Sequence, residues 1–263
     1  MKKAAIVTGG TSGIGKAAAL ALIKNGFKVY ELSRREKGIE GMHHISVDIT
    51  DEKAVENAIN EILKSEKRID LLVNNAGFGI SGAIEFTGTE AAKRLFDVNF
   101  FGTVNVSRAV IPIMREQRFG RIINVSSVAA PVAIPFQAFY SATKAAVNKY
   151  TLALANEIRP YGVTVCAVQP GDIKTGFTGA REKFIEGDDV YSGRISKGVA
   201  QMEKDEQNGM EPEQIGNFIA KLALKKKVKP IYTVGLSYKL VTFLVKILPD
   251  SFQNYIVGQI YAK

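Results

Sequence analysis

The chain is poor in residues that cross-link proteins or bind metals. Its 263 residues include no tryptophan, two histidines and one cysteine, Cys166. One cysteine excludes an internal disulfide, and we expect a reducing, cytoplasmic location. Cys166 lies in a valine-rich run that is typical of a buried strand, so we expect a small core residue and not a nucleophile. No His, Cys and carboxylate cluster has metal-ligand spacing, so we expect no catalytic metal.

Long hydrophobic runs are also missing. A bilayer-spanning helix takes about 20 apolar residues, and the run at 240–248 is too short. The chain passes from Met1-Lys2-Lys3 directly into an apolar strand-like run, which leaves no room for a signal peptide. We therefore expect no transmembrane segment. The C-terminal tail, residues 236–263, is rich in apolar residues, and peripheral contact with a membrane is one alternative hypothesis for its role.

Acidic residues are outnumbered by basic ones, with a net charge of +9. The excess is concentrated in residues 211–263, which hold eight lysines and three acidic residues, with the densest run at Lys225–Lys229. No helix-turn-helix, zinc or RNA-binding signature accompanies this run, so we expect no nucleic-acid partner. A solvated basic surface that also attracts an anionic cofactor or substrate is the favoured interpretation.

Apolar strand-like runs alternate with helical segments along the chain. The strand-like runs are 3–8, 28–33, 43–49, 69–73, 120–126 and 162–168, and the helical segments include 16–25, 51–66, 89–118 and 138–159. Such alternation gives a parallel sheet with helices on both faces. No repeat or long linker divides the chain. We predict one α/β domain over residues 1–263, with a Rossmann-type doubly wound parallel sheet flanked by helices.

A glycine-rich turn, Gly9-Gly10-Thr11-Ser12-Gly13-Ile14-Gly15, joins the first strand to the first helix. Glycines let the backbone approach a pyrophosphate closely, and the helix N-terminus offers N–H donors and a positive dipole. The turn therefore predicts a dinucleotide site, with a generic strand-to-helix turn as the alternative.

The residues at the end of the second strand indicate that the cofactor is NADP(H) and not NAD(H). An NAD site uses a carboxylate about 20 residues after the glycine motif, but here the strand ends in Ser33-Arg34-Arg35. The planar guanidinium of Arg34 suits a 2′-phosphate. Glu31, the nearest acid, lies two residues too early. The alternative is that Arg34 and Arg35 are merely exposed to solvent.

Tyr140 and Lys144 stand one helical turn apart, and Ser127 lies upstream of them. At this spacing the phenol and the ammonium share a helix face. A lysine cation beside a tyrosine lowers the phenol pKa from about 10, which suits proton transfer during carbonyl reduction or alcohol oxidation. A solvated helix face is the alternative.

These motifs resemble the short-chain dehydrogenase/reductase family in order and spacing, over residues 3–175 and more loosely beyond. The motifs are Thr8–Gly15, Asn74-Asn75-Ala76-Gly77, Asn99, Ser127, Tyr140 with Lys144, and Pro170-Gly171. The resemblance implies that Tyr140 donates the proton, Ser127 binds the carbonyl oxygen, and Lys144 lowers the tyrosine pKa and holds the nicotinamide ribose. It also implies that Asn99 maintains a helix irregularity and a water leading to Lys144.

The same resemblance implies a cofactor site for NADP(H) along the strand ends. Its expected members are Gly9, Thr11, Ser12, Gly13, Ile14, Gly15, Ser33, Arg34, Arg35, Asp48, Ile49, Asn75, Ala76, Gly77, Tyr140, Lys144, Pro170, Gly171, Ile173 and Thr175. Asp48 and Ile49 would meet the adenine, and Ile173 and Thr175 the nicotinamide carboxamide.

The expected substrate is a small hydrophobic carbonyl or alcohol. Residues 128–136 form an apolar approach to Tyr140, and the long irregular segment 176–210 corresponds to the family's substrate lid. The chain resembles hydroxysteroid-dehydrogenase-like or lipid-ketone-reductase-like members, which implies an oxidoreductase that interconverts a ketone and a secondary alcohol, such as a steroid, bile acid or lipid ketone. A 3-oxoacyl thioester reductase or a general carbonyl reductase is the alternative.

Two other function classes are less consistent with the motifs. An NADPH-sensing regulator usually lacks the tyrosine or the lysine, and an extended-branch epimerase or dehydratase has another glycine spacing and a longer substrate domain.

The resemblance further implies a homodimer or homotetramer that pairs through helices 89–118 and 138–159. The apolar residues Phe96, Phe100, Val147 and Leu154 exceed what one face of a surface helix needs. The tail at 236–263 would then lie across the active-site mouth, which we favour, or at a second interface.

Overall fold

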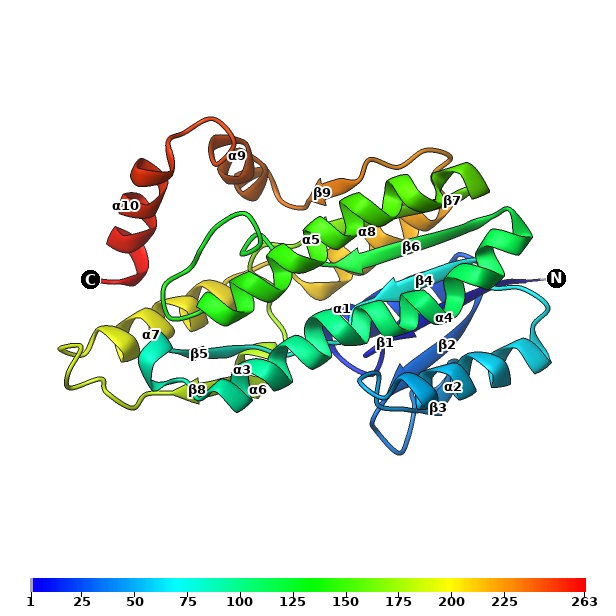
Figure 1. The fold of residues 1–263 in the computed structure, drawn as a ribbon, viewed down its shortest axis with the longest axis horizontal. Coiled ribbons are helices and arrows are strands. Elements are labelled where there is room, and N and C mark those ends of the chain that lie inside the picture. The colour runs from blue at the N-terminus through cyan, green and yellow to red at the C-terminus, as the bar shows by residue number, and fades with distance from the viewer. Residues whose placement is uncertain (1) are drawn as a thin grey trace.

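A seven-stranded parallel sheet forms the centre of the molecule (Figure 1) in a computed structural model that describes residues 2–263. The strand order is β3-β2-β1-β4-β6-β7-β9. The strands are β1 (Lys3–Thr8), β2 (Phe27–Ser33), β3 (His43–Ser46), β4 (Leu71–Asn74), β6 (Gly120–Val125), β7 (Val163–Gln169) and β9 (Ile231–Thr233). The predicted doubly wound sheet in a single domain is confirmed. Only β9, three residues long, has no counterpart among the predicted strands.

Helices cover both faces of the sheet. One face carries α1 (Gly13–Lys24) and α8 (Pro212–Leu224). The other carries α2 (Glu52–Ser65), α4 (Gly102–Gln117) and α5 (Ala138–Ile158). Short 3₁₀ turns at Ile84–Phe86 and Arg159–Tyr161 link the larger elements.

Each face of the sheet has its own hydrophobic core. Side chains alternate between the faces along a strand, so within β1 Val7 packs with α1 and α8, whereas Ile6 packs with α2, α4 and α5. Both side chains are fully buried. Burial on both faces explains why β1 reads as a continuous apolar run.

The strand order reverses between β1 and β4. From β1 the chain extends the sheet toward β2 and β3, and from β4 toward β6, β7 and β9. Connections that leave the carboxyl ends of β1 and β4 therefore diverge, and in open α/β sheets this point is where ligands bind. The glycine-rich turn after β1 and the Asn75-Ala76-Gly77 loop after β4 meet there.

The predicted helix at 89–118 is interrupted. It consists of α3 (Thr89–Phe96), a π-helical segment at Asp97–Phe101, and α4. Asn99 lies buried in this segment, where its Oδ1 accepts the Phe78 N–H at 3.0 Å and its Nδ2 donates to the Phe78 carbonyl at 3.0 Å. The helix irregularity that the resemblance implies at Asn99 is present, and it aims the amide at the loop after β4.

Residues 176–210 are more regular than predicted. They form α6 (Phe177–Ala180), β8 (Glu182–Phe184) and α7 (Arg194–Gln207), and β8 pairs in parallel with β5 (Ile80–Gly82). The expectation of a long irregular segment is therefore wrong. The three-residue strands depend on a partner distant in sequence, so they carry no local signal of their own.

The chain ends in α9 (Leu236–Leu244) and α10 (Asp250–Tyr261). Figure 1 shows these two helices arching from the end of β9 toward α7. Across residues 2–263, no helix has both the length and the apolar character that a membrane crossing requires.

Two residues that we expected at a subunit interface lie inside the protein. Val147 is 1% exposed and Leu154 is 5% exposed, and Leu154 packs in the core between α5 and the sheet. Their apolar character is used within the chain and so does not support subunit pairing. Phe96 and Phe100 are half-buried, and homo-oligomerisation stays a prediction.

The close packing of α8 on α1 generates a stability prediction. A Cβ on Gly216 would overlap the backbone of Ala17 in α1. Because backbone cannot move aside as a side chain does, Gly216→Ala should lower the free energy of unfolding by about 1–3 kcal/mol, measured by urea denaturation followed by circular dichroism.

Gly258→Ala in α10 is the matched control, because no atom lies within 4 Å of its added Cβ. Removing a helical glycine there should raise the free energy of unfolding by about 0.5–1 kcal/mol. Equal stability of Gly216→Ala and the wild type would contradict the close approach of α1 and α8.

Candidate active site

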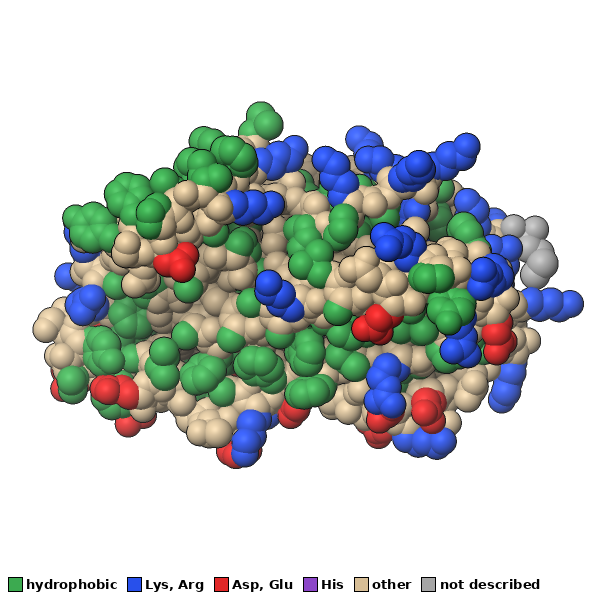
Figure 2. All heavy atoms as spheres, turned by 45° about the horizontal axis from the view of Figure 1, so that its top comes forward, with side chains coloured by type: hydrophobic (Ala, Val, Ile, Leu, Met, Phe, Trp, Pro, Cys, Tyr) green, Lys and Arg blue, Asp and Glu red, His purple; other side chains and the backbone are tan. Residues whose placement is uncertain are grey.

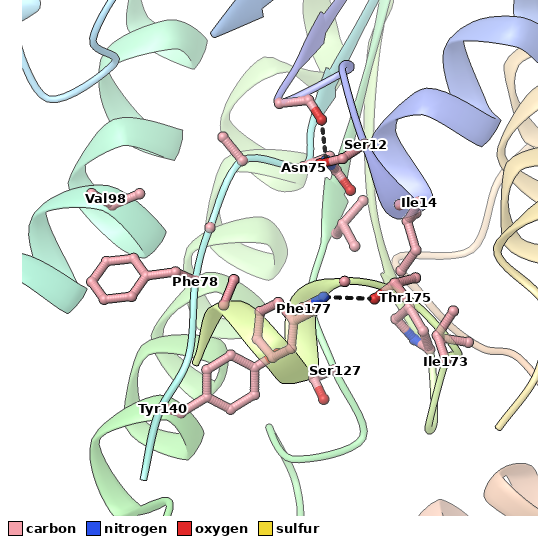
Figure 3. A pocket seen from close by; sticks show the side chains of 18 of the residues that line it. Ser12, Ile14, Asn75, Phe78, Val98, Ser127, Tyr140, Ile173, Thr175 and Phe177 are labelled. Carbon is pink, nitrogen blue, oxygen red and sulfur yellow. Dashed lines mark hydrogen bonds between the residues drawn. The ribbon is translucent and has the colours of Figure 1, made fainter. Parts of the chain in front are cut away.

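A cavity of about 840 Å³ lies where the strand order reverses. Its wall is built from the segments that follow the carboxyl ends of β1, β2, β3, β4, β6 and β7, together with the start of α5. The volume is in the usual range for a small-molecule or cofactor site, about 300–1,000 Å³. Figure 3 shows part of the lining, with side chains from several elements directed into the cavity.

The glycine-rich turn forms one end of the wall and depends on Gly15. A Cβ on Gly15 would overlap the Gly9 carbonyl and the Asn75 amide. Ser12 is the N-cap of α1, and its side chain makes no capping hydrogen bond to the helix. The N-terminus of α1 and the Ser12 hydroxyl are therefore available at the cavity, while Gly15 lies behind the lining.

Thr8 ties the loops after β1 and β4 together. Its hydroxyl accepts the backbone N–H groups of Asn75, at 2.9 Å, and Ala76, at 3.0 Å. In return Asn75 Nδ2 donates to the carbonyl oxygens of Thr8, at 3.1 Å, and Gly9, at 3.2 Å. These bonds hold the two loops at a fixed separation across the cavity.

A basic rim closes the end of the cavity beside β2. Ser33, Arg34, Arg35, Asp48 and Ile49 line it, and both arginines are exposed. In the part of the chain that the structure describes, neither guanidinium forms an ion pair. Two cations without a protein partner favour an anionic ligand at this end.

Glu31 is not available to such a ligand. Its side chain is fully buried behind the lining, with Oε1 accepting the Gly10 N–H at 3.0 Å and Oε2 lying 2.5 Å from His44 Nδ1. The Glu31 carboxylate therefore binds the glycine-rich turn through the Gly10 N–H, on the side away from the cavity. Its position agrees with the prediction that it lies too early in β2 to bind a ribose.

Ser127, Tyr140 and Lys144 come together at the opposite end of the wall. Lys144 is buried, and its Nζ donates to the Val125 carbonyl at 3.0 Å and lies 5.7 Å from the centre of the Tyr140 ring. The neighbouring Ser126 hydroxyl is buried and donates to the Lys144 carbonyl at 3.2 Å. Ser127 is thus the serine whose side chain contacts the phenol, and Figure 3 shows Ser127 and Tyr140 on the same part of the wall.

The pKa values of Tyr140 and Lys144 differ from those expected from the sequence. Burial raises the pKa of the Tyr140 phenol to about 12, although its contact with Ser127 lowers it, and the charge of Glu206 raises it further. Burial lowers the pKa of Lys144 to about 8. The pKa of the phenol is therefore raised and not lowered as we expected, because desolvation is the largest effect on it. At neutral pH Tyr140 keeps its proton.

Asn99 and Gly15 are the two predicted site residues that do not line the cavity. Asn99 contacts the residues beside the cavity. Its Oδ1 would lie 2.9 Å from a Cβ placed on Gly77, and its Nδ2 donates to Thr143 Oγ1 at 3.3 Å. It therefore braces the loop after β4 against α5. All the other predicted site residues line the cavity.

Several lining residues were missed, above all Phe78, Val98, Gln137, Asp172, Phe177 and Glu206. The Phe177 ring centre lies 5.7 Å from that of Tyr140. Glu206 reaches in from α7, where it accepts the Thr178 hydroxyl at 2.6 Å and pairs with the buried Arg181. Phe177 and Glu206 lie in the segment 176–210 that we linked to the substrate, and Asp172 lies in the expected cofactor loop, but no local pattern distinguishes Glu206 from the other charged residues of its helix.

The C-terminal tail contacts the cavity wall. Tyr238 of α9 donates its hydroxyl to Asp172 Oδ2 at 2.6 Å, and its ring packs on Gly171. Burial of Asp172 raises the pKa of its carboxyl group. Both Gly171 and Asp172 line the cavity, so α9 is attached to the wall itself.

Other reactive groups lie away from the cavity. Cys166 is buried in β7, and burial raises the pKa of its thiol to about 12. Within residues 2–263, no three His, Cys, Asp or Glu side chains are grouped so that they could hold a metal ion.

Comparisons with known proteins agree with this geometry. The family model described as "short chain dehydrogenase" matches residues 3–186. The chain is 38% identical to the 3-ketodihydrosphingosine reductase of Bacteroides thetaiotaomicron, over 98% of this chain and 97% of that protein. The crystal structure of a short-chain dehydrogenase from Streptomyces avermitilis superposes with a TM-score of 0.84 at 30% identity, covering 98% of this chain and 96% of that one. ElxO with NADP bound gives a TM-score of 0.77 at 29% identity, covering 91% and 100%.

Proposed function

Because the chain belongs to the short-chain dehydrogenase/reductase family of oxidoreductases, we propose that it transfers a hydride between NADP(H) and a hydrophobic ketone or secondary alcohol. One observation carries the proposal: Ser127, Tyr140 and Lys144 line the same cavity as the glycine-rich turn. A proton donor and a dinucleotide-binding turn in one cavity are the two parts that this reaction requires.

The residues of the cavity fit a dinucleotide. The lack of a side chain on Gly15 lets the turn pack closely against Gly9 and Asn75. Gly9 and Gly13 line the cavity, where glycines let the backbone approach a pyrophosphate closely. The uncapped Ser12 and the N-terminus of α1 would hold the phosphates, and Asp48 and Ile49 the adenine. Tyr140, Lys144, Ile173 and Thr175 would hold the nicotinamide half. A nicotinamide bound there supplies or accepts the hydride.

NADP(H) is the proposed form of the cofactor. Arg34 and Arg35 have no anionic partner among residues 2–263, and the one acid of β2, Glu31, is buried behind the wall. A 2′-phosphate at this rim would meet two cations, while the carboxylate of Asp48, which also lines the rim, accepts the N–H and the hydroxyl of Thr50. The bound NADP of ElxO, a protein 29% identical to this chain, supports the same choice.

The chain's own residues would handle the charge at the carbonyl. Ser127 donates a hydrogen bond to the substrate oxygen, and Tyr140 passes its proton to that oxygen as the carbonyl becomes an alcohol. The raised pKa of Tyr140 ensures that this proton is present at neutral pH. The Lys144 ammonium, held by the Val125 carbonyl beside the phenol ring, stabilises the phenolate that remains.

For the substrate we propose a long-chain lipid ketone. Apolar side chains, including Phe78, Val128, Ile134 and Phe177, surround the approach to Tyr140. Two carboxylates interrupt this apolar lining: Glu206, which is already paired with Arg181, and Asp172, whose Oδ2 accepts the Tyr238 hydroxyl. Asp172 suits a substrate that carries an amine. The 38% identity to a 3-ketodihydrosphingosine reductase, over nearly the whole chain, supports the same class.

The first functional prediction concerns the substrate and Tyr140. Purified protein should oxidise NADPH with a long-chain 3-keto amine more efficiently than with a steroid ketone or a 3-oxoacyl thioester. The absorbance of the reduced nicotinamide measures the rate.

Tyr140→Phe keeps the ring but removes the proton donor, so kcat should fall about 100-fold or more, while the Kd for NADPH changes little.

Tyr161→Phe is the control, since Tyr161 is 40% exposed and distant from the lining. It should leave kcat unchanged. Near-wild-type turnover by Tyr140→Phe would show that another group is the acid, and a preference for the steroid or the thioester would overturn the substrate class.

A second prediction follows from the lowered pKa of Lys144. The cation is present below about pH 8 and lost above it, whereas Tyr140 keeps its proton to about pH 12. The kcat for ketone reduction at saturating NADPH should therefore fall as the pH rises through about 8. The guanidinium of Lys144→Arg stays charged over this pH range. The kcat of this variant, even if it is low, should therefore not fall as the pH rises through about 8. A fall at the same pH in both proteins would assign it to another group.

The third prediction tests the cofactor. Ser33→Asp combined with Arg34→Gln should shift the ratio of the NADPH and NADH dissociation constants toward NADH by about tenfold to a hundredfold, the value of a charge-assisted contact. Fluorescence titration without substrate measures this ratio. Lys37→Gln, an exposed lysine outside the lining, controls for net charge and should leave the ratio unchanged. Tighter binding of NADH than NADPH by the wild type would refute the assignment.

A further inference from the structure

The last two helices expose their apolar side chains. Half of the large hydrophobic side chains that are exposed within residues 2–263 lie between Leu236 and Ile260. On α9 and the following turn they recur at 236, 240, 243 and 247, and on α10 at 252, 256 and 260. These spacings of three and four residues form one stripe along each helix. Figure 2 shows the resulting hydrophobic area over α9 and α10 at the upper left.

Polar side chains of the same helices point inward. Tyr238 bonds to Asp172, Thr242 Oγ1 lies 3.1 Å from Thr233 Oγ1, and Gln253 Nε2 donates to two carbonyl oxygens of the preceding turn. A surface helix ordinarily turns its apolar stripe toward the core and its polar face to water. In α9 and α10 the apolar stripes are exposed instead, and α10 has no buried residue. The apolar stripes thus lack a partner within the described chain.

Lysines border this apolar face. Residues 225–263 contain seven lysines and one acidic residue, Asp250. All seven lysines are exposed, and none forms an ion pair within residues 2–263. Figure 2 shows basic side chains continuing from the hydrophobic area along the same edge of the molecule. Apolar stripes flanked by lysines are the pattern of helices that lie in a membrane interface.

Charge decides between a membrane and a second copy of the chain. A two-fold interface brings the same patch of both subunits together, so Lys239 and Lys246 and the lysines around them would approach their own copies, with Asp250 as the one acid of residues 225–263 on each side. An anionic lipid surface has the opposite charge, and each lysine near it contributes about 1 kcal/mol of attraction. The bilayer interior also accepts the apolar stripes that water does not.

Both helices adjoin the cavity. α9 contacts its wall through Tyr238, which packs on Gly171 and bonds to Asp172. The end of α10 packs through Tyr261 into the cluster that includes Ile134, another lining residue. A surface that received α9 and α10 would therefore lie beside the approach to Tyr140.

We propose that the exposed face of α9 and α10, with the lysines of residues 225–263, docks on a bilayer that contains anionic lipids. The mouth of the cavity then lies at the membrane surface, where a lipid ketone enters without crossing water. This delivery step rests on the proposed function, whereas binding to the bilayer does not.

Vesicle flotation with the full chain tests the docking. The wild type should float with vesicles of phosphatidylcholine and phosphatidylglycerol, bind vesicles of phosphatidylcholine alone more weakly, and lose affinity for the anionic vesicles as salt rises. Leu240→Ser with Phe243→Ser should lower the affinity for anionic vesicles about tenfold or more. Ile84→Ser with Ile185→Ser is the matched control, since those side chains are 63% and 62% exposed against 59% and 58%.

The charge is tested in the same way. Lys239→Gln with Lys246→Gln should weaken binding to anionic vesicles about tenfold and flatten its salt dependence. Lys64→Gln with Lys67→Gln, exposed lysines on and after α2, should not change it.

Three results would overturn the proposal. They are no binding of the wild type to anionic vesicles at low salt, equal losses in the apolar and control pairs, and a concentration-dependent assembly in light scattering that Leu240→Ser with Phe243→Ser dissolves. The last would identify a second copy as the occupant.

Turnover of a short, water-miscible ketone without vesicles separates docking from catalysis. It should be equal in the wild type and in Leu240→Ser with Phe243→Ser. Turnover without vesicle binding would refute the docking and leave the proposed function intact. Vesicle binding without turnover of any ketone would do the opposite.

Discussion

The site depends on the hydroxyl of Thr8 at the end of β1. This one acceptor takes the N–H groups of Asn75 and Ala76 and so joins the loops of the two strands between which the sheet order reverses. The turn built on Gly15 packs against the same Asn75 side chain, and Asn99 braces the far end of the loop after β4. The glycine-rich turn and the loop after β4 are thereby held together by hydrogen bonds of the Thr8, Asn75 and Asn99 side chains.

Burial has opposite effects on the two ionisable groups of the proposed reaction. It disfavours the charged form of each, so the pKa of Tyr140 rises to about 12 while that of Lys144 falls to about 8. A phenol that holds its proton is the state that ketone reduction uses, and the lysine is then the group that titrates near physiological pH. The spacing of Tyr140 and Lys144 in the sequence indicates that the two groups are neighbours but not that both are buried. In the cavity wall, desolvation dominates.

The parts predictable from sequence are those with local causes. Continuous apolar runs identified six of the seven sheet strands. The site residues that the family resemblance implied after these strands line one cavity, apart from Gly15 and Asn99. What failed depends on tertiary partners. The β5–β8 pair joins two short segments about 100 residues apart, and Glu206 enters the lining only because Arg181 and Thr178 hold it there. Val147 was expected on an outer face, but composition alone does not tell which side of α5 meets the sheet.

The C-terminal tail shows how two weak sequence features become informative when they share a surface. The lysine excess of residues 225–263 and the apolar run at 240–248 each have ordinary explanations, a solvated surface and a buried helix. The structure removes the second explanation, because the side chains at 236, 240, 243 and 247 point away from the protein. Exposed apolar stripes are unfavourable in water at about 25 cal/mol per Å², while the inward polar contacts of Tyr238 and Thr242 fix α9 in this orientation. Rotating the helix would break those bonds and bring the apolar stripe against polar groups at the cavity wall. A partner that buries apolar surface and attracts lysines would account for both the exposed stripes and the lysine excess. A membrane with anionic lipids has both properties.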